Sequence, residues 1–350
     1  MFTELMKPTY DRFAGEGNGY RQARTMMLDT AIRLLSFMKQ FAPSQQAARR
    51  RCEEILDVPY MADGNNAHRL DIVRPKTQSG LLPVLMYIHG GGFALCSKDT
   101  HRGLGLIYAA RGYLVFNINY RLSPKFPFPA ALEDVAAAYQ WIVEYAAACG
   151  GDPNRIIVSG ESAGANLALA LTISSCFRRH EPAASKIWET GVVPRVCMPM
   201  CGMLQVSHPQ RLKHVSVHGS RIPRTFGTAV AEDVSKAYLG REYRTPRHET
   251  ALADPLLVME SNAIAGRPLP SFYAMAGTAD ILIDDTRRLE RALYRRGVRN
   301  VVRYYPNQGH AFHLVGTGSQ AKEFWHDHLT FLSREMARQH VLHQFCNLNR

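Results

Sequence analysis

Residues 155–171 read RIIVSGESAGANLALAL, and their character changes in the middle. Three consecutive β-branched residues at 156–158 predict a short buried strand, and the alanine- and leucine-rich run at 165–174 predicts a buried helix. Ser162 stands at the junction, between Gly160 and Gly164. This G-x-S-x-G spacing between a strand and a helix is typical of a nucleophile elbow, in which glycines prevent collisions in a sharp turn and the serine Oγ stays exposed. The alternative is a glycine-rich turn without chemistry, so the chain must also supply partners for the serine.

Composition narrows the class of protein. With 350 residues, of which 46% are hydrophobic and 21% charged, the chain can bury a large core in one or two domains. No apolar run approaches the length of a membrane span, and the first residues, MFTELMKPTYDRF, lack the pattern of a secretion signal. We therefore expect a soluble, cytoplasmic protein without a membrane span.

The cysteine and charge patterns disfavour a metal centre and a nucleic-acid interface. Seven scattered cysteines predict reduced thiols. Cys197 and Cys201 offer half of a metal site, but no CxxC or HExxH motif accompanies them. The net charge of +12 comes from basic residues spread along the chain without interleaved aromatics. We expect no metal, no nucleic acid and a solvated basic surface.

Strand-like and helix-like runs alternate from about residue 69 onward. This alternation predicts an α/β fold with a mostly parallel central sheet covered by helices on both faces. Reactive groups should then gather at the carboxyl ends of the strands. The predicted strands are 68–75, 82–90, 113–120, 155–160, 192–200, 271–280 and 300–307, and the predicted helices are 104–111, 131–149, 163–178, 285–296 and 321–338.

Two segments interrupt this alternation. Residues 1–50 carry a helical pattern with no adjacent strand, and residues 206–253 form a long polar insertion with a helical stretch at its centre. We predict N-terminal cap helices in 1–50, a catalytic α/β domain in 51–335 with 206–253 as an inserted second cap segment, and a C-terminal tail in 336–350. A packed N-terminal helix unrelated to any substrate is the alternative for the first segment.

A run of glycines follows the strand that ends near Ile88, in the stretch HGGGF at 89–93. Three glycines cannot stabilise a strand, so they indicate a loop whose backbone N–H groups closely approach another group. A tetrahedral acyl intermediate needs such donors, and we expect Gly91, Gly92 and Ala163 to form an oxyanion hole, with His89 orienting the loop. A phosphate-binding loop is the alternative, but neither a Lys-Ser/Thr pair nor a G-x-G-x-x-G spacing follows.

These motifs together make the chain resemble a known family. HGGGF, the stretch YRLSPKFPFPAALEDV at 120–135, GESAG at 160–164 and a late Asp and His are similar to those of hormone-sensitive-lipase-like esterases of the α/β-hydrolase fold, over about residues 69–333. The resemblance implies that fold with a helical cap, an ester substrate and no cofactor. Glu161 stands where many members carry Asp, and Lys125 where Glu is common. We expect neither residue to touch the chemistry directly.

The resemblance also identifies the base. His310 follows the last predicted strand, in a loop opened by Pro306 and Gly309, where α/β-hydrolases carry the catalytic histidine. His313 is the rival, three residues further on. The match to the family's loop favours His310.

The acid should follow the preceding strand, and Asp280 ends that strand. Asp284 and Asp285 come after an apolar run and are typical of carboxylates at a helix N-terminus. The order Ser162, Asp280, His310 is the α/β-hydrolase order, so we predict that these residues form a catalytic triad.

The predicted function is that of a serine carboxylesterase, which hydrolyses short- to medium-chain esters through an acyl-enzyme. The chain-length expectation rests on the polar, basic segment 206–253, which lacks the apolar stripe of an interfacial lipase lid. An amidase, deacetylase or lactone hydrolase with the same triad stays open, as do a small-ligand receptor on the same fold and a homodimer. Candidates for the acyl pocket, unless they merely fill the core, are Phe93, Leu95, Leu204, Phe226, Phe312 and Val315.

Overall fold

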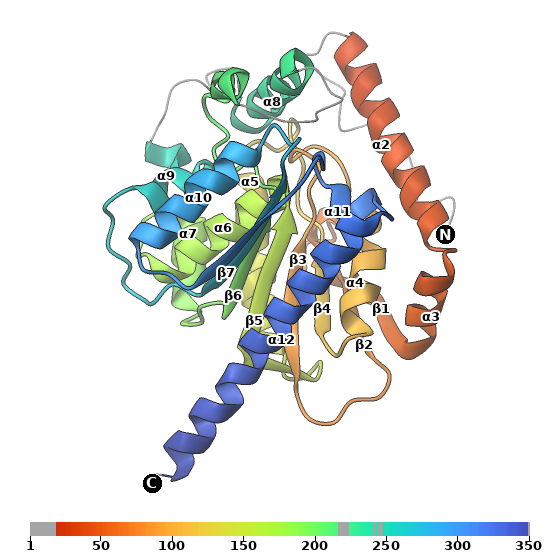
Figure 1. Cartoon of the computed structure of the whole chain (residues 1–350), viewed down its shortest axis with the longest axis vertical. Helices are drawn as coiled ribbons and strands as arrows, with labels where there is room; N and C mark the ends of the chain where they lie inside the picture. The colour runs from red at the N-terminus through yellow and green to blue at the C-terminus, as the bar shows by residue number, and fades with distance from the viewer. Residues whose placement is uncertain (1–18, 216–223, 241–242, 244–247, 349–350) are drawn as a thin grey trace.

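An eight-stranded sheet forms the centre of the computed structural model, which describes residues 19–215, 224–240, 243 and 248–348. β2 is antiparallel to its neighbours β1 and β4, and all other pairs are parallel. Helices cover both faces (Figure 1), so the predicted fold class is confirmed. In spatial order the strands are β1 (Cys52–Pro59), β2 (Arg69–Pro75), β4 (Leu114–Ile118), β3 (Leu82–Ile88), β5 (Gly151–Glu161), β6 (Val196–Met200), β7 (Ser271–Gly277) and β8 (Asn300–Tyr305).

β1 is the strand that the sequence analysis did not predict. Its residues, CEEILDVP, do not alternate between buried and exposed, and most of them face solvent. It lies at the edge of the sheet and pairs only with β2. An edge strand tolerates acidic side chains that a central strand excludes, and so it lacks the apolar pattern by which strands are recognised.

Alternate side chains of the central strands are buried on opposite faces. In β3, Val84, Met86 and Ile88 pack with α5 and α6, whereas Leu85 and Tyr87 pack with α4 and α12. Both faces are covered, so a parallel strand reads as a continuous apolar run. The layers contain α4 (Arg102–Ala109), α5 (Ala130–Tyr145), α6 (Ala163–Cys176), α7 (Pro182–Glu189), α9 (Pro255–Glu260), α10 (Ile283–Arg295), α11 (Phe312–Val315) and α12 (Ser319–Leu348).

Three further helices belong to the predicted cap segments. α2 (Gly19–Lys39) and α3 (Pro43–Arg51) precede the sheet, and α8 (Arg224–Leu239) follows β6. Figure 1 shows α8 beyond the ends of the strands and α2 along the outside of the molecule. The second segment also contains the short 3-10 helices η3 (Pro209–His214) and η4 (His248–Ala253), and residues 1–18, 216–223, 241–242 and 244–247 lie outside the described residues.

α12 extends further than predicted. The sequence analysis placed a boundary between residues 335 and 336, but the helix is continuous to Leu348, and Figure 1 shows its end leading away from the sheet. The residues after the predicted boundary contain neither glycine nor proline, so no local signal ends the helix there. Despite its length, neither this helix nor any other in the described part of the chain is apolar enough to cross a membrane.

Candidate active site

Ser162 occupies the turn between β5 and α6. Its backbone has φ 56° and ψ −116°, a strained conformation that non-glycine residues rarely adopt away from functional sites. The flanking glycines have no room for a side chain. A Cβ on Gly160 would lie 2.6 Å from the Gly164 carbonyl, and a Cβ on Gly164 would lie 2.0 Å from the Ile88 carbonyl oxygen. The predicted reason for glycine at both positions is therefore confirmed.

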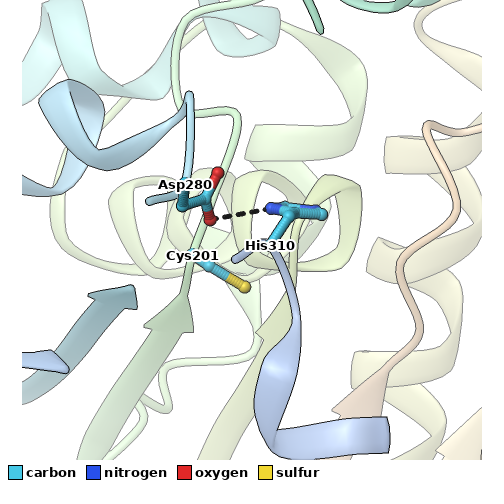
Figure 2. Close-up of side chains that lie close together, drawn as sticks. All are labelled: Cys201, Asp280 and His310. Atoms are coloured by element: carbon cyan, nitrogen blue, oxygen red, sulfur yellow. Dashed lines mark hydrogen bonds and ion pairs between the residues drawn. The ribbon is translucent and has the colours of Figure 1, made fainter. Parts of the chain in front are cut away.

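Side chains from three strand ends form a hydrogen-bonded chain. Nε2 of His310, which follows β8, lies 3.0 Å from Oγ of Ser162. Nδ1 of the same ring lies 2.8 Å from Oδ2 of Asp280, which follows β7, and Figure 2 shows these two side chains pointing toward one another. The other Asp280 oxygen accepts a hydrogen bond from the N–H of Leu282 at 2.9 Å. The structure thus brings together the three residues that the sequence analysis selected.

Asp280 shapes the acid–base behaviour of His310. Burial favours the neutral ring, but the charge of Asp280 and its hydrogen bond outweigh burial and raise the pKa of His310 above its ordinary value. When Nδ1–H donates to the carboxylate, Nε2 carries the lone pair that faces Ser162. The ring can then accept the serine proton, and the resulting positive charge lies next to Asp280.

Cys201 is the third side chain in Figure 2, and the sequence analysis did not place it here. Its Sγ and the donor atoms of Asp280 and His310 all lie within 4.8 Å of one another. Burial and the negative charges of Asp280 and Glu161 raise the pKa of this thiol well above its ordinary value, so it is neutral. The three groups are of metal-binding types, but Asp280 and His310 are hydrogen-bonded to each other. Cys197 packs on the opposite face of the sheet, so the half-site considered from the sequence does not form.

His313, the rival base, is a core residue of α11. It is 3% exposed, and its ring centre lies 4.7 Å from that of Phe324. Burial lowers the pKa of His313 to about 3, and neither ring nitrogen has a hydrogen-bond partner among the described residues. The ring is therefore neutral and does not contact Ser162, which leaves His310 as the histidine of the site.

The glycine loop lies against the elbow because β3 and β5 are neighbours in the sheet. Gly91 and Gly92 have φ of 105° and 60°, which favours glycine over other residues. A Cβ on Gly91 would lie 2.4 Å from the Leu95 carbonyl oxygen. Ala163 is the first residue of α6, and its N–H precedes the hydrogen bonds of the helix, so it can face an oxygen outside the helix. The backbone conformation of these residues suits the predicted oxyanion hole.

Glu161, directly before Ser162, anchors this loop. One carboxylate oxygen accepts the Gly90 N–H at 2.5 Å and lies 2.9 Å from Nε2 of His101, and the other accepts the hydroxyl of Tyr87. Burial favours the neutral acid, but His101 and the hydrogen bonds outweigh it and lower the pKa of Glu161 to about 2. Likewise, burial lowers the pKa of His101, but Glu161 outweighs it and the pKa is raised.

None of these hydrogen bonds reaches Ser162, Asp280 or His310, but they fix the start of the glycine loop, a role that the sequence analysis did not predict. The signal in the sequence that could have indicated this role is the position of Glu161 directly before Ser162, because a carboxylate beside the serine of a buried turn is itself buried and needs partners. Lys125, the other departure from the family pattern, is exposed, and its Nζ lies 5.6 Å from the centre of the Phe126 ring.

Two further carboxylates hold the chain segment 204–207, where the insertion begins. Asp285 accepts the backbone N–H groups of residues 204 and 205 at 2.9 and 3.2 Å and pairs with Arg211 at 2.6 Å. Asp254 accepts the backbone N–H groups of residues 206 and 207 at 2.6 and 2.9 Å. Asp285 lies in the first turn of α10, as predicted, and it is completely buried.

The six candidates for the acyl pocket differ in exposure. Phe93 and Leu204 have no exposed surface, and the Phe93 ring stacks on Tyr238 with centres 3.6 Å apart. Phe312 is 5% exposed and Leu95 9%. A side chain without accessible surface cannot line an open cavity, so Phe93 and Leu204 are core residues in this structure. Phe226 and Val315 are 49% and 55% exposed.

α8 contacts both sides of the site, a feature that the sequence analysis did not resolve. At one end of the helix, a Cβ on Gly227 would lie 2.8 Å from Cδ1 of Ile281, next to Asp280. Further along, Cγ2 of Val234 lies 2.9 Å from where a Cβ on Gly92 would be. The helix therefore spans from the acid loop to the glycine loop, and Figure 1 shows it on the corresponding side of the sheet.

Comparison with known proteins identifies the fold and the family. A family described as having the alpha/beta hydrolase fold matches residues 85–314. The chain is 30% identical over 244 residues to an acetyl-hydrolase of Streptomyces hygroscopicus, which covers 69% of this chain and 71% of the relative. It is 44% identical over 91 residues to a carboxylesterase of Mycobacterium tuberculosis, 26% of this chain and 28% of that protein.

A solved structure with a similar fold is a bacterial heroin esterase. It has a TM-score of 0.64 at 26% sequence identity, and the match covers 81% of this chain and 84% of the esterase chain. The family match at 85–314 spans β4 to β8 and includes the positions of Ser162, Asp280 and His310.

Proposed function

The chain belongs to the α/β-hydrolase family of hormone-sensitive-lipase-like esterases, and on that premise we propose that it is a serine carboxylesterase. The observation that supports the serine mechanism is the chain of hydrogen bonds from Asp280 through His310 to Ser162. A hydroxyl is a poor nucleophile unless a base removes its proton, and this arrangement supplies the base and a group that orients it.

In the acylation step, Oγ of Ser162 forms a bond to the ester carbonyl carbon as its proton passes to Nε2 of His310. The carbonyl oxygen becomes an oxyanion, which the backbone N–H groups of Gly91, Gly92 and Ala163 stabilise. When the tetrahedral intermediate collapses, the carbon–oxygen bond of the ester breaks, and the leaving alkoxide takes the proton from His310. Asp280 stabilises the imidazolium throughout.

In the deacylation step, water attacks the acyl-enzyme and gives a proton to His310. The second intermediate releases Oγ of Ser162, which takes the proton back, and the carboxylic acid departs. Every proton and electron pair in the cycle is accounted for by the ester, water and these side chains. The proposal therefore includes no metal and no cofactor.

We assign short- to medium-chain esters as substrates, because α8 lies over both sides of Ser162. A helix that contacts Ile281 and the glycine loop limits the length of acyl chain that fits beneath it. The name of the acetyl-hydrolase relative supports the same assignment. A cytoplasmic location, predicted from the sequence, is part of the proposal.

Rates on p-nitrophenyl acetate, butyrate, octanoate and palmitate and on emulsified triolein test the chain-length assignment. We expect acetate or butyrate to give the highest kcat/KM and triolein to give no measurable rate. Faster hydrolysis of palmitate than of butyrate would contradict it. An aryl amide and a lactone in the same assay decide against the amidase and lactonase alternatives if both react far more slowly than the esters. The receptor alternative predicts no turnover of any of them.

A further inference from the structure

The polarity of α2 is the reverse of that of an ordinary surface helix, which buries its apolar side. Its buried side chains Asp29 and Arg33 are 3% and 8% exposed, and Gln40, directly after the helix, is 5% exposed. Its exposed side chains are almost all apolar. We call these the α2 outer face: Met27, Leu28, Ala31, Leu34, Leu35 and Met38, with Phe41 just after the helix.

Polar contacts hold the inner side of α2 in this orientation. Asp29 pairs with Arg33 at 2.6 Å and accepts the N–H of Cys96 at 3.3 Å, in the loop that follows the glycine run. Lys39 donates a hydrogen bond to the carbonyl of Leu314 in α11, shortly after His310. Turning the helix to bury its apolar residues would break these contacts, so the outward position of the apolar face is specified.

The exposed area is large enough for a stable interface. Six large side chains of the α2 outer face are between 38% and 73% exposed. These fractions correspond to on the order of 700 Å² of apolar surface, more than the about 300–600 Å² of the largest patch on a typical monomer. A specific protein–protein interface buries about 800 Å² on each partner. The α2 outer face alone supplies most of that area.

Residue spacing and charge indicate what covers the face. Met27, Ala31, Leu34, Met38 and Phe41 follow one another at alternating intervals of four and three, which is the spacing of a helix that packs along another helix. Among exposed residues from 27 to 41, Thr30 is the one polar residue and none is charged.

An anionic lipid surface is a poorer match. Helices that lie on such surfaces carry exposed lysines and arginines beside their apolar stripe. Between residues 27 and 39, the part of α2 whose side chains the structure describes, the basic residues are Arg33 and Lys39. Arg33 is paired with Asp29, and Lys39 is hydrogen-bonded to α11, so these two side chains are used inside the protein.

We propose that the α2 outer face binds the same face of a second copy of this chain, with the two helices antiparallel about Leu34. A two-fold dimer places one surface against itself, and Leu34 lies midway between Met27 and Phe41, so each end of one helix meets the opposite end of the other. The small side chain of Ala31 lets the helices approach closely. Because α2 contacts the loops beside the site through Asp29 and Lys39, the second copy holds these cap contacts in place.

Sedimentation equilibrium of the full chain tests the proposal, and its result does not depend on whether the protein hydrolyses esters. We expect a mass of twice 39.3 kDa at micromolar concentration. The double variant Leu34→Glu, Met38→Glu should weaken association at least about 100-fold, because it buries four carboxylates in the interface. The matched control is Ile264→Glu, which adds a charge at an apolar residue that is 92% exposed, and it should remain dimeric. Circular dichroism checks that both variants fold.

A cross-link locates the interface directly. The variant Leu34→Cys should form a disulfide-linked dimer on mild oxidation, whereas Ile264→Cys should not. A wild-type chain that stays monomeric, or a dimer unaffected by the double variant, would overturn the proposal. A monomer that binds vesicles of anionic phospholipid through Leu34 would also overturn it, because lipid would then cover the face. A monomer whose Tm falls sharply in the double variant would overturn it as well, because the chain's own residues would then cover the face.

Discussion

The carboxyl edge of the sheet and the cap are built in different ways. At the edge, Gly160 and Gly164 leave no room for a Cβ, and the buried carboxylate of Glu161 binds groups from β3, the glycine loop and the following loop. The cap touches the same region mainly through apolar contacts of α8, such as that of Val234 with the glycine loop. Polar contacts and close packing allow one geometry, while apolar contacts allow several. Changes to the triad and its supports at the edge should therefore lower kcat, and changes in the cap should alter which esters react.

Among changes that keep the nucleophile, the largest effect should come from Asp280→Asn, which keeps the shape of the side chain. An amide leaves His310 in the wrong tautomer, and the equivalent change in serine proteases costs about 10⁴-fold in kcat, so we expect a loss of that order. Asp284→Asn is the matched control. Its carboxylate is partly buried at the start of α10, and the change should cost less than about threefold. Steady-state kinetics with p-nitrophenyl butyrate measure both variants. Equal losses of kcat would show that Asp280 is not a member of the triad.

Glu161→Gln should have the next largest effect. The amide can no longer accept from Gly90, Tyr87 and His101 together, so the glycine loop shifts relative to Ser162. We expect kcat to fall about 10- to 100-fold and KM to change less than about threefold. Complete loss of one oxyanion donor costs about 10²- to 10³-fold in kcat, and a shifted loop should cost less.

A positioning role for Glu161 makes two further demands. His101→Gln should give a similar loss, and the double variant should be no worse than the worse single variant, because both act through one network. Glu161→Asp, which retains the charge, should recover part of kcat. A loss confined to KM, or full additivity, would show that Glu161 does not position the loop.

The pH dependence of kcat/KM should reflect the His310–Asp280 pair. The raised pKa of His310 means that the ring becomes protonated below a midpoint that lies above 6.5, and the protonated ring cannot accept the Ser162 proton. Activity should therefore fall about tenfold for each pH unit below that midpoint. In Asp280→Asn the residual activity should have a lower midpoint, because the charge that raises the pKa is gone. An unchanged midpoint would mean that another group controls the acid limb.

The smallest effect should follow Val234→Ala in the cap. Removing two methyl groups above Gly92 enlarges the space over the glycine loop, so the octanoate-to-acetate ratio of kcat/KM should rise a few-fold, about 1 kcal/mol. The rate on acetate should stay within about twofold. Val298→Ala, which truncates a partly buried valine between α10 and β8, is the control and should leave the ratio unchanged. An equal change of the octanoate-to-acetate ratio in both variants would show that α8 does not determine the preference for chain length.

The sequence predicted the residues whose roles are encoded locally. Ser162 is recognisable because its glycine neighbours and the strand–helix switch lie within a few residues. Asp280 and His310 are recognisable because strand ends of a parallel sheet meet at one edge. These predictions need the position of a residue relative to its own strand and, for His310 over His313, the resemblance to the family's loop.

The contacts that the sequence analysis did not predict depend on partners far along the chain. Glu161 acquires its role from Gly90 and His101, which lie 71 and 60 residues away. Asp285 serves backbone groups of the segment at 204–205, and no periodicity reveals such a pairing. Cys201 reaches Asp280 and His310 only because β6 and β7 are neighbours. Buried polar groups of this kind are specified by tertiary structure, and a single sequence carries no signal for their partners.

The central claim is that esters are hydrolysed through a covalent bond to Ser162. It is tested most directly by treating the full chain with a fluorophosphonate, following the loss of p-nitrophenyl butyrate hydrolysis and mapping the adduct by peptide mass spectrometry. We predict one adduct per chain, on the peptide that contains Ser162, formed in step with the loss of activity and absent from Ser162→Ala, which should itself lose at least about 10³-fold in kcat while keeping its Tm. Full activity in Ser162→Ala, or inactivation by an adduct on a different residue, would contradict the account.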